Sequence, residues 1–297
     1  MESDPEAGRR EVSTGLRAAG QRATGLIALA LLALPGCTQQ PATPPAGSVA
    51  KPDADEFIAL VNAQLKPVLR EVAAADWTQA TDITIDTQLL SARANDRYLE
   101  FLGDRTGEAK AYADAPGTPA TKRSLKLLKL QTSAPAPSDP AKRTELTEIL
   151  ASLGAMYGEG KVCPSGPASC RNLDQLSETL ATSRDYATLE QAWVGWHDTA
   201  RPMRPKYQRF VELANEGARE FGFADLGAMW RSGYDMPPDE FAAVVSRLWG
   251  QVQPLYNGMQ CYARGRLAQR YGEDKVPAGK PIPAHLLGNL WAQTWNK

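Results

Sequence analysis

From Asp53 onward, the apolar residues of this chain recur at helical spacing, and this periodicity most constrains the fold. The first stripe on one helix face consists of Phe57, Val61, Leu65, Val68 and Val72. No run shows sustained alternation of apolar and polar residues between hairpin turns, so strands are not required. The sequence therefore predicts an all-α protein.

Further helices are predicted over 86–102, 122–130, 146–156, 173–183, 186–200, 205–221 and 238–271. A last helix is predicted to begin near Pro283, with Leu290, Trp291 and Trp295 on its apolar face. This stretch has no capping residue and no proline beyond it. We therefore expect that the chain stops inside an apolar helix.

The N-terminal stretch predicts export. Arginines precede an apolar run over 26–34, which is too short to cross a bilayer core of about 30 Å but suits a signal peptide. The run ends in Leu-Pro-Gly-Cys37, which resembles a bacterial lipobox with Cys37 as the lipidated residue. We interpret 1–37 as signal peptide and lipobox, and 38–52, rich in Pro, Ala and Thr, as a flexible linker. Two locations stay open: a membrane-anchored lipoprotein or a soluble protein of the bacterial periplasm.

Composition excludes one class of partner. The formal net charge is -1, so no basic field would attract nucleic acid. Hydrophobic residues make up 43% of the chain, which is enough for a sizeable core.

Cysteine spacing predicts one disulfide. Cys163 and Cys170 bracket a short turn-rich loop, and an oxidising compartment favours their pairing. No other Cys or His lies near enough in the sequence to support a metal site there. Cys261 is predicted to be a buried free thiol within a helix.

The sequence also resembles a known family. Pro281-Ile-Pro-Ala-His-Leu-Leu-Gly-Asn-Leu-Trp-Ala-Gln-Thr-Trp295 is similar to a segment of the zinc peptidyl-dipeptidases related to angiotensin-converting enzyme. Further similar blocks follow the family's order at 75–84, 181–186, 192–198, 222–227, 230–234 and 253–256. The resemblance covers roughly 53–297 and stops before the family's metal site. A small disulfide-closed loop occurs at the matching place in the family.

The resemblance implies a fold and an activity. Residues 53–297 would form a partial peptidyl-dipeptidase domain, comprising the lid helices and part of one half of a two-lobed helical metallopeptidase. The family binds zinc through a His-Glu-x-x-His helix and a later glutamate, is activated by chloride, and releases C-terminal dipeptides from peptide substrates. The two histidines here, His197 and His285, fall in different predicted helices without that motif. We therefore assign no catalytic residue or metal ligand and predict that the chain alone is inactive.

Several binding residues follow from matching motif positions. Gln293 matches the glutamine that binds the substrate's C-terminal carboxylate, and Thr294 matches a residue lining the pocket for the last side chain. Tyr234 matches a tyrosine that helps to bind chloride. His197 stands where some members have an arginine that holds a second chloride, and a neutral imidazole binds anions more weakly. Otherwise both histidines are interpreted as structural, and the tryptophans as core residues.

Two functional hypotheses from different classes stay open. The first is an N-terminal fragment of an exported zinc metallopeptidase, whose partner could be a separately encoded C-terminal half. The alternative is a helical lipoprotein that lost catalysis and binds peptides or a partner helix. The unpartnered apolar end favours the fragment.

Overall fold

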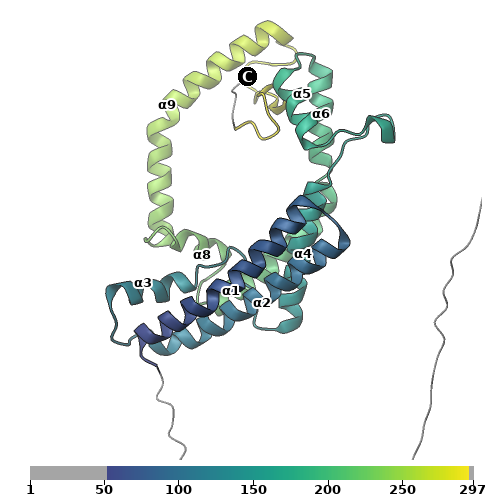
Figure 1. Ribbon diagram of the computed structural model, residues 1–297. Helices are drawn as coiled ribbons and strands as arrows, with labels where there is room; N and C mark the ends of the chain where they lie inside the picture. Colours follow the sequence, from purple (N-terminus) through teal and green to yellow (C-terminus); the bar gives the residue numbers. More distant parts are fainter. Residues whose placement is uncertain (1–51, 294–297) are drawn as a thin grey trace, which may run out of the picture. The chain divides into compact units, whose positions relative to one another are not determined.

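The computed structural model describes residues 52–293 (Figure 1). Within that range the helices are α1 (Ala54–Thr81), α2 (Ile85–Ala109), α3 (Pro119–Leu128), α4 (Pro140–Gly158), α5 (Leu173–Thr182), α6 (Tyr186–Asp198), α7 (Arg204–Glu220), α8 (Leu226–Ser232) and α9 (Pro238–Tyr271). Short 3₁₀ turns occur at Lys110–Tyr112, Pro167–Ser169, Arg201–Met203 and Ala284–Leu286. The described part of the chain contains isolated β-bridges but no strand, which confirms the predicted all-α class.

Local capping explains where several helices begin. At α1 the backbone N–H of Glu56 donates to Asp53 at 2.9 Å, and the N–H of Asp53 donates to Glu56 at 3.2 Å. Asn172 and Gln175 form the same reciprocal pair at α5. Proline occupies the first position of α3, α4 and α9, where its missing N–H has no intrahelical partner to lose.

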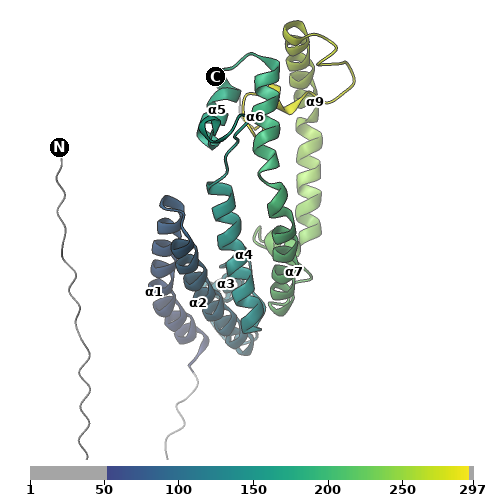
Figure 2. The same cartoon turned by 90° about the vertical axis from the view of Figure 1, so that its right-hand side faces the viewer.

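The first hydrophobic core lies among α1, α2, α4 and α7. Leu102, Leu146 and Leu213 are fully buried in it, and α3 and α8 contribute further apolar residues. Figure 2 shows α1 and α2 side by side, and α2 also packs against α4. The stripe predicted on α1 faces this core.

A second core joins α5 and α6 to the end of α9. Leu176, Leu189 and Leu267 come from these three helices, and Leu286 and Leu290 come from the segment that follows α9. The segment after α9 is therefore held by apolar packing although it is mostly irregular.

Helix α9 is 34 residues long and has the predicted bounds. It contacts α8 at one end and contributes Leu267 to the second core near its other end. Between these points its apolar side chains are exposed, including Trp249. Cys261 is also exposed, so its prediction as a buried thiol was wrong. Of the tryptophans that were interpreted as core residues, Trp196 of α6 is buried.

Two tryptophans outside α9 also contradict the core interpretation. Trp230 and Trp291 are about half exposed, although Trp230 Nε1 donates to the carbonyl of Ser133 at 2.9 Å. Helix α8, which carries Trp230, was not predicted. Its seven residues are too few for a periodic signal.

The predictions for the N-terminus lie outside the described residues. This applies to the signal peptide, to lipidation of Cys37 and to the linker. Within the described part, none of the helices is sufficiently long and apolar to span a membrane.

Candidate functional site

The segment that carries Gln293 is not the helix that was predicted. Beyond the 3₁₀ turn Ala284–Leu286, Gly288 and Ala292 adopt positive φ values of 84° and 52°. Asn289 Oδ1 accepts a hydrogen bond from the backbone N–H of Trp291 at 2.8 Å. Such a side-chain acceptor competes with helical hydrogen bonding, and positive φ values end a right-handed helix. The prediction of a helix here was therefore wrong over the described residues.

Packing nevertheless fixes the position of this segment. Leu290 is 1% exposed in the second core, and Trp193 Nε1 donates to its carbonyl oxygen at 3.1 Å. The neighbouring Trp291 is 48% exposed. One residue of the segment is thus anchored while the next faces outward.

Gln293 lies three residues beyond that anchor and is exposed. Its backbone N–H approaches Asn289 Oδ1 at 3.5 Å. An exposed carboxamide can donate to a carboxylate, as the predicted substrate-binding role requires. Thr294 lies outside the described residues, so its predicted position next to Gln293 stays a prediction.

Tyr234 lies at the junction of α8 and α9 and is 61% exposed. Its ring stacks on Phe241 with the centroids 4.1 Å apart. Gln293 follows the other end of α9, so the long helix separates these two predicted site residues along the chain (Figure 1). The structure therefore does not place Tyr234 and Gln293 in one binding site.

A charged cluster lies next to Tyr234. Asp235 has a φ of 60° and accepts hydrogen bonds from Arg123 and from Lys126 Nζ, the latter at 2.7 Å. The hydrogen bonds from Arg123 and Lys126 lower the pKa of Asp235 from 3.8 to about 2. Helix α3 is thereby attached to the α8–α9 junction, a link that was not predicted.

Both histidines have structural contacts. His197 stacks on Trp193 at 3.8 Å, and its Nδ1 lies 2.7 Å from the Trp193 carbonyl, to which it can donate. His285 is buried, with its ring edge-on to Tyr186. Burial lowers the His285 pKa, against the opposing charge of Glu190.

The donor set does not fit the zinc site that the family resemblance implies. Two histidines on separate elements cannot reproduce a His-Glu-x-x-His helix. Across residues 52–293, no group of three His, Cys, Asp or Glu side chains is arranged to hold a metal ion. We therefore assign no reaction step to the described residues.

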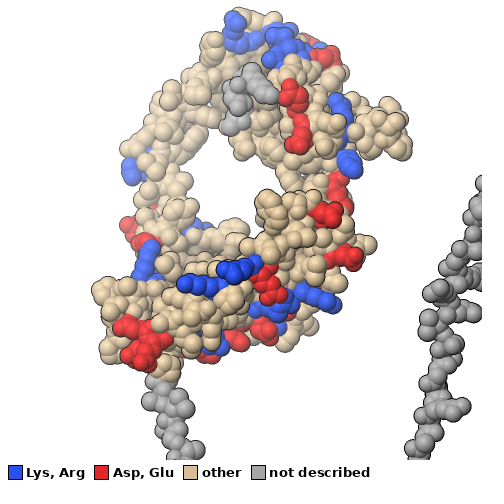
Figure 3. All heavy atoms as spheres, viewed as in Figure 1, with Lys and Arg blue, Asp and Glu red and all other residues tan. Residues whose placement is uncertain are grey.

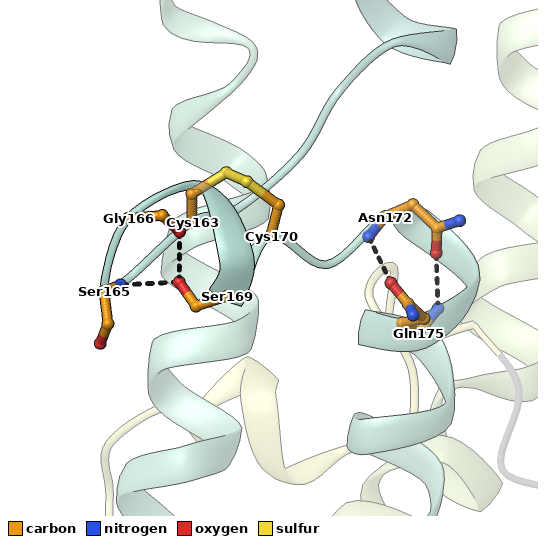
Figure 4. The surroundings of a disulfide bond; sticks show 7 residues. All are labelled: Cys163, Ser165, Gly166, Ser169, Cys170, Asn172 and Gln175. Atoms are coloured by element: carbon orange, nitrogen blue, oxygen red, sulfur yellow. Dashed lines mark hydrogen bonds between the residues drawn. A yellow bond between two sulfur atoms is a disulfide. The ribbon is translucent and has the colours of Figure 1, made fainter. Parts of the chain in front are cut away.

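The loop from Cys163 to Cys170 is closed by internal bonds (Figure 4). A disulfide joins Cys163 to Cys170. Inside the loop, Ser169 Oγ accepts from the Ser165 N–H at 2.8 Å and donates to the Gly166 carbonyl at 2.7 Å. Gly166 has a φ of 94°, which a side chain would strain.

Two cavities were not anticipated from the sequence. One, of about 640 Å³, lies between α4 and the start of α7 and is lined mainly by apolar and aromatic side chains, among them Leu153, Tyr157 and Tyr207. The other, of about 320 Å³, lies among α5, α6 and the end of α9. Their walls come from residues distant in the sequence, so no local pattern could have indicated them.

Known proteins supply the identification. Residues 48–297 match the family described as Angiotensin-converting enzyme. The angiotensin-converting enzyme of Sus scrofa is 39% identical over 251 residues, covering 82% of this chain and 19% of that protein. The enzyme of Oryctolagus cuniculus is 38% identical over 247 residues, covering 80% of this chain and 18% of that protein. The enzyme of Theromyzon tessulatum is 31% identical over 255 residues, covering 82% of this chain and 40% of that protein.

The fold and these matches define an all-helical member of a metallopeptidase family. The chain belongs to the angiotensin-converting enzyme family. It spans between about a fifth and two fifths of the length of these three relatives.

Proposed function

We propose that this chain is the N-terminal part of an exported zinc peptidyl-dipeptidase that releases C-terminal dipeptides from peptides. The observation that carries the proposal is the coverage of the matches: 82% of this chain aligns with 19% of the relative from Sus scrofa. The possible zinc ligands in this sequence also support the proposal, because its two histidines cannot form the family's zinc motif. The zinc ligands and the general base would lie in another segment.

Within that enzyme, residues 53–297 would supply lid helices and one part of the groove wall. Gln293 would donate its amide to the C-terminal carboxylate of the substrate, and Thr294 would line the neighbouring pocket. Tyr234 would help to bind chloride. The exposure of Gln293 and Tyr234 supports these roles, because both side chains are accessible to a ligand.

The N-terminal residues would direct the chain out of the cytoplasm. The composition of 1–37 supports a signal peptide with Cys37 as its lipidation site, and 38–52 would tether the domain. The protein would then be either lipid-anchored or soluble in the periplasm.

The chain alone should not hydrolyse peptides. We would purify it and measure chelator-sensitive release of a C-terminal dipeptide from a blocked tripeptide in zinc-supplemented buffer. No release is expected, and zinc-dependent turnover would overturn the assignment of inactivity.

The DNA beyond the Lys297 codon would be read in all three frames, and a His-Glu-x-x-His helix with a later glutamate is expected.

Co-expression with the downstream segment then tests the role of Gln293. In the reconstituted enzyme, Gln293→Ala should raise KM for a peptide with a free C-terminal carboxylate. A peptide with a C-terminal amide provides the control, since it lacks the charge that Gln293 would bind. An equal effect on both peptides would contradict the role.

A further inference from the structure

A basic cavity lies between the end of α5, the start of α6 and the last turns of α9. Its volume is about 320 Å³, and the segment after α9 closes one side. Three arginines line it: Arg184 from the α5–α6 loop, and Arg266 and Arg270 from α9. Figure 3 shows basic side chains gathered over this end of α9.

In the described part of the chain, acidic side chains stay outside the lining of this cavity, although the charge of Glu190 acts on His285 in its wall. Among the described residues that line it, none is Asp or Glu, and none of the three arginines forms an ion pair within residues 52–293. Arg184 uses only Nη1, which donates to the carbonyls of Ala181 and Ser183.

Arg266 Nη1 donates to Gln269 Oε1 at 3.5 Å, which is a long hydrogen bond. Arg270 lies 5.9 Å from the centroid of the Tyr271 ring. A guanidinium carries five N–H donors, so most donors of all three arginines remain available. Guanidinium donors match the paired oxygens of carboxylates and phosphates.

A buried polar atom lies in the wall of the same cavity. His285 lines it and is 6% exposed, and its Nε2 is enclosed without any hydrogen-bond partner. The ring packs edge-on against Tyr186 with the centroids 4.6 Å apart, so it is held in place by packing. An unpaired polar atom is unfavourable in a folded interior, and a ligand oxygen would relieve it.

We propose that this cavity binds a small oxyanion, carboxylate or phosphate, with the arginine guanidiniums as its charged donors and His285 as a donor from its wall. The site lies away from Tyr234 and uses neither Gln293 nor any metal. It therefore does not depend on the peptidase assignment, and either proposal can fail without the other.

Binding to the full chain would be measured by calorimetry with inorganic phosphate and, separately, acetate. Sodium chloride at matched ionic strength controls for general screening. We expect saturable binding of at least one oxyanion, and comparison of the two titrations identifies whether phosphate or carboxylate is preferred. Saturation by neither would overturn the proposal.

Matched variants locate the binding. Arg266→Gln combined with Arg270→Gln should weaken it about tenfold, because charge-assisted hydrogen bonds are lost. Arg247→Gln is the control, since Arg247 lies on the same helix outside the cavity and makes a similar hydrogen bond to Gln251 at 3.4 Å. Equal weakening by Arg247→Gln would show nonspecific attraction and overturn the site.

The histidine provides a readout that needs no substitution. The chain has two histidines, so their imidazole signals can be followed by NMR during the titration. The His285 signal should shift saturably with the same midpoint as the calorimetric curve, and the His197 signal should not. Movement of both signals or of neither would contradict binding at this cavity.

Discussion

At the scale of single residues, packing decides which positions tolerate change. Gly217 of α7 lies against the segment that precedes α4, and an added Cβ would lie 2.2 Å from the Pro135 carbonyl oxygen. Gly103 of α2 has no atom within 4 Å of that position. Two helical glycines of one chain therefore have opposite requirements.

Gly217→Ala should destabilise the fold. The Cβ would meet backbone that cannot rotate away, and overpacking of this kind costs about 1–3 kcal/mol. Gly103→Ala is the matched control and should raise the free energy of unfolding by about 0.5–1 kcal/mol, because alanine favours the helix. Urea denaturation followed by circular dichroism measures both changes. Similar effects of the two substitutions would contradict this packing.

At the scale of elements, two links between distant segments can be tested. Asp235 attaches α3 to the α8–α9 junction through Arg123 and Lys126. Its pKa is lowered from 3.8 to about 2, so the stabilisation is fully present above pH 3.8 and is lost as the pH falls through about 2.

Asp235→Asn should therefore loosen α3 at neutral pH. The expected result is faster amide hydrogen exchange across Pro119–Leu128, with little change in α4. High salt should produce part of the same effect in the unsubstituted chain, because these groups are exposed to solvent. Unchanged exchange in α3 would mean that apolar packing alone holds the helix.

The disulfide closes a loop in which the two cysteines are seven positions apart. Paired Cys163→Ser and Cys170→Ser substitutions should lower the free energy of unfolding by about 2.5 kcal/mol on the loop-entropy estimate. Cys261→Ser should leave it unchanged, because that thiol is exposed and unpaired. Denaturant titration of the three proteins distinguishes these outcomes, and an equal loss in Cys261→Ser would be inconsistent with the pairing.

Helical periodicity predicted most elements because it depends on local spacing. It failed at the segment after α9, where Leu287, Leu290 and Trp291 have helical spacing. There the Asn289 side chain accepts a hydrogen bond from the Trp291 N–H, and Gly288 has a positive φ, so the backbone turns instead. The candidate site residues could be proposed only through the family resemblance, since an exposed glutamine such as Gln293 has no distinguishing sequence pattern. The exposure of Cys261 could not be inferred from the sequence of its own helix, because it depends on what packs against that helix.

At the scale of the whole molecule, the exposed apolar side chains of α9 are the surface from which we expect self-association. They occupy the middle of the helix: Val245, Leu248, Trp249, Val252, Leu255, Tyr256, Met259 and Tyr262. Figure 3 shows few charged side chains along α9 on the face in view. Contiguous exposed apolar surface of this kind favours association.

The purified chain should therefore self-associate, and a charge in this surface should suppress the effect. Leu255 is 70% exposed, so Leu255→Glu removes apolar surface with little cost to the fold. Gln251→Glu adds the same charge on the same helix without removing an apolar group, and serves as the control. Light scattering against concentration should show a higher association threshold for Leu255→Glu than for Gln251→Glu. Equal thresholds would mean that net charge, rather than the apolar surface of α9, governs association.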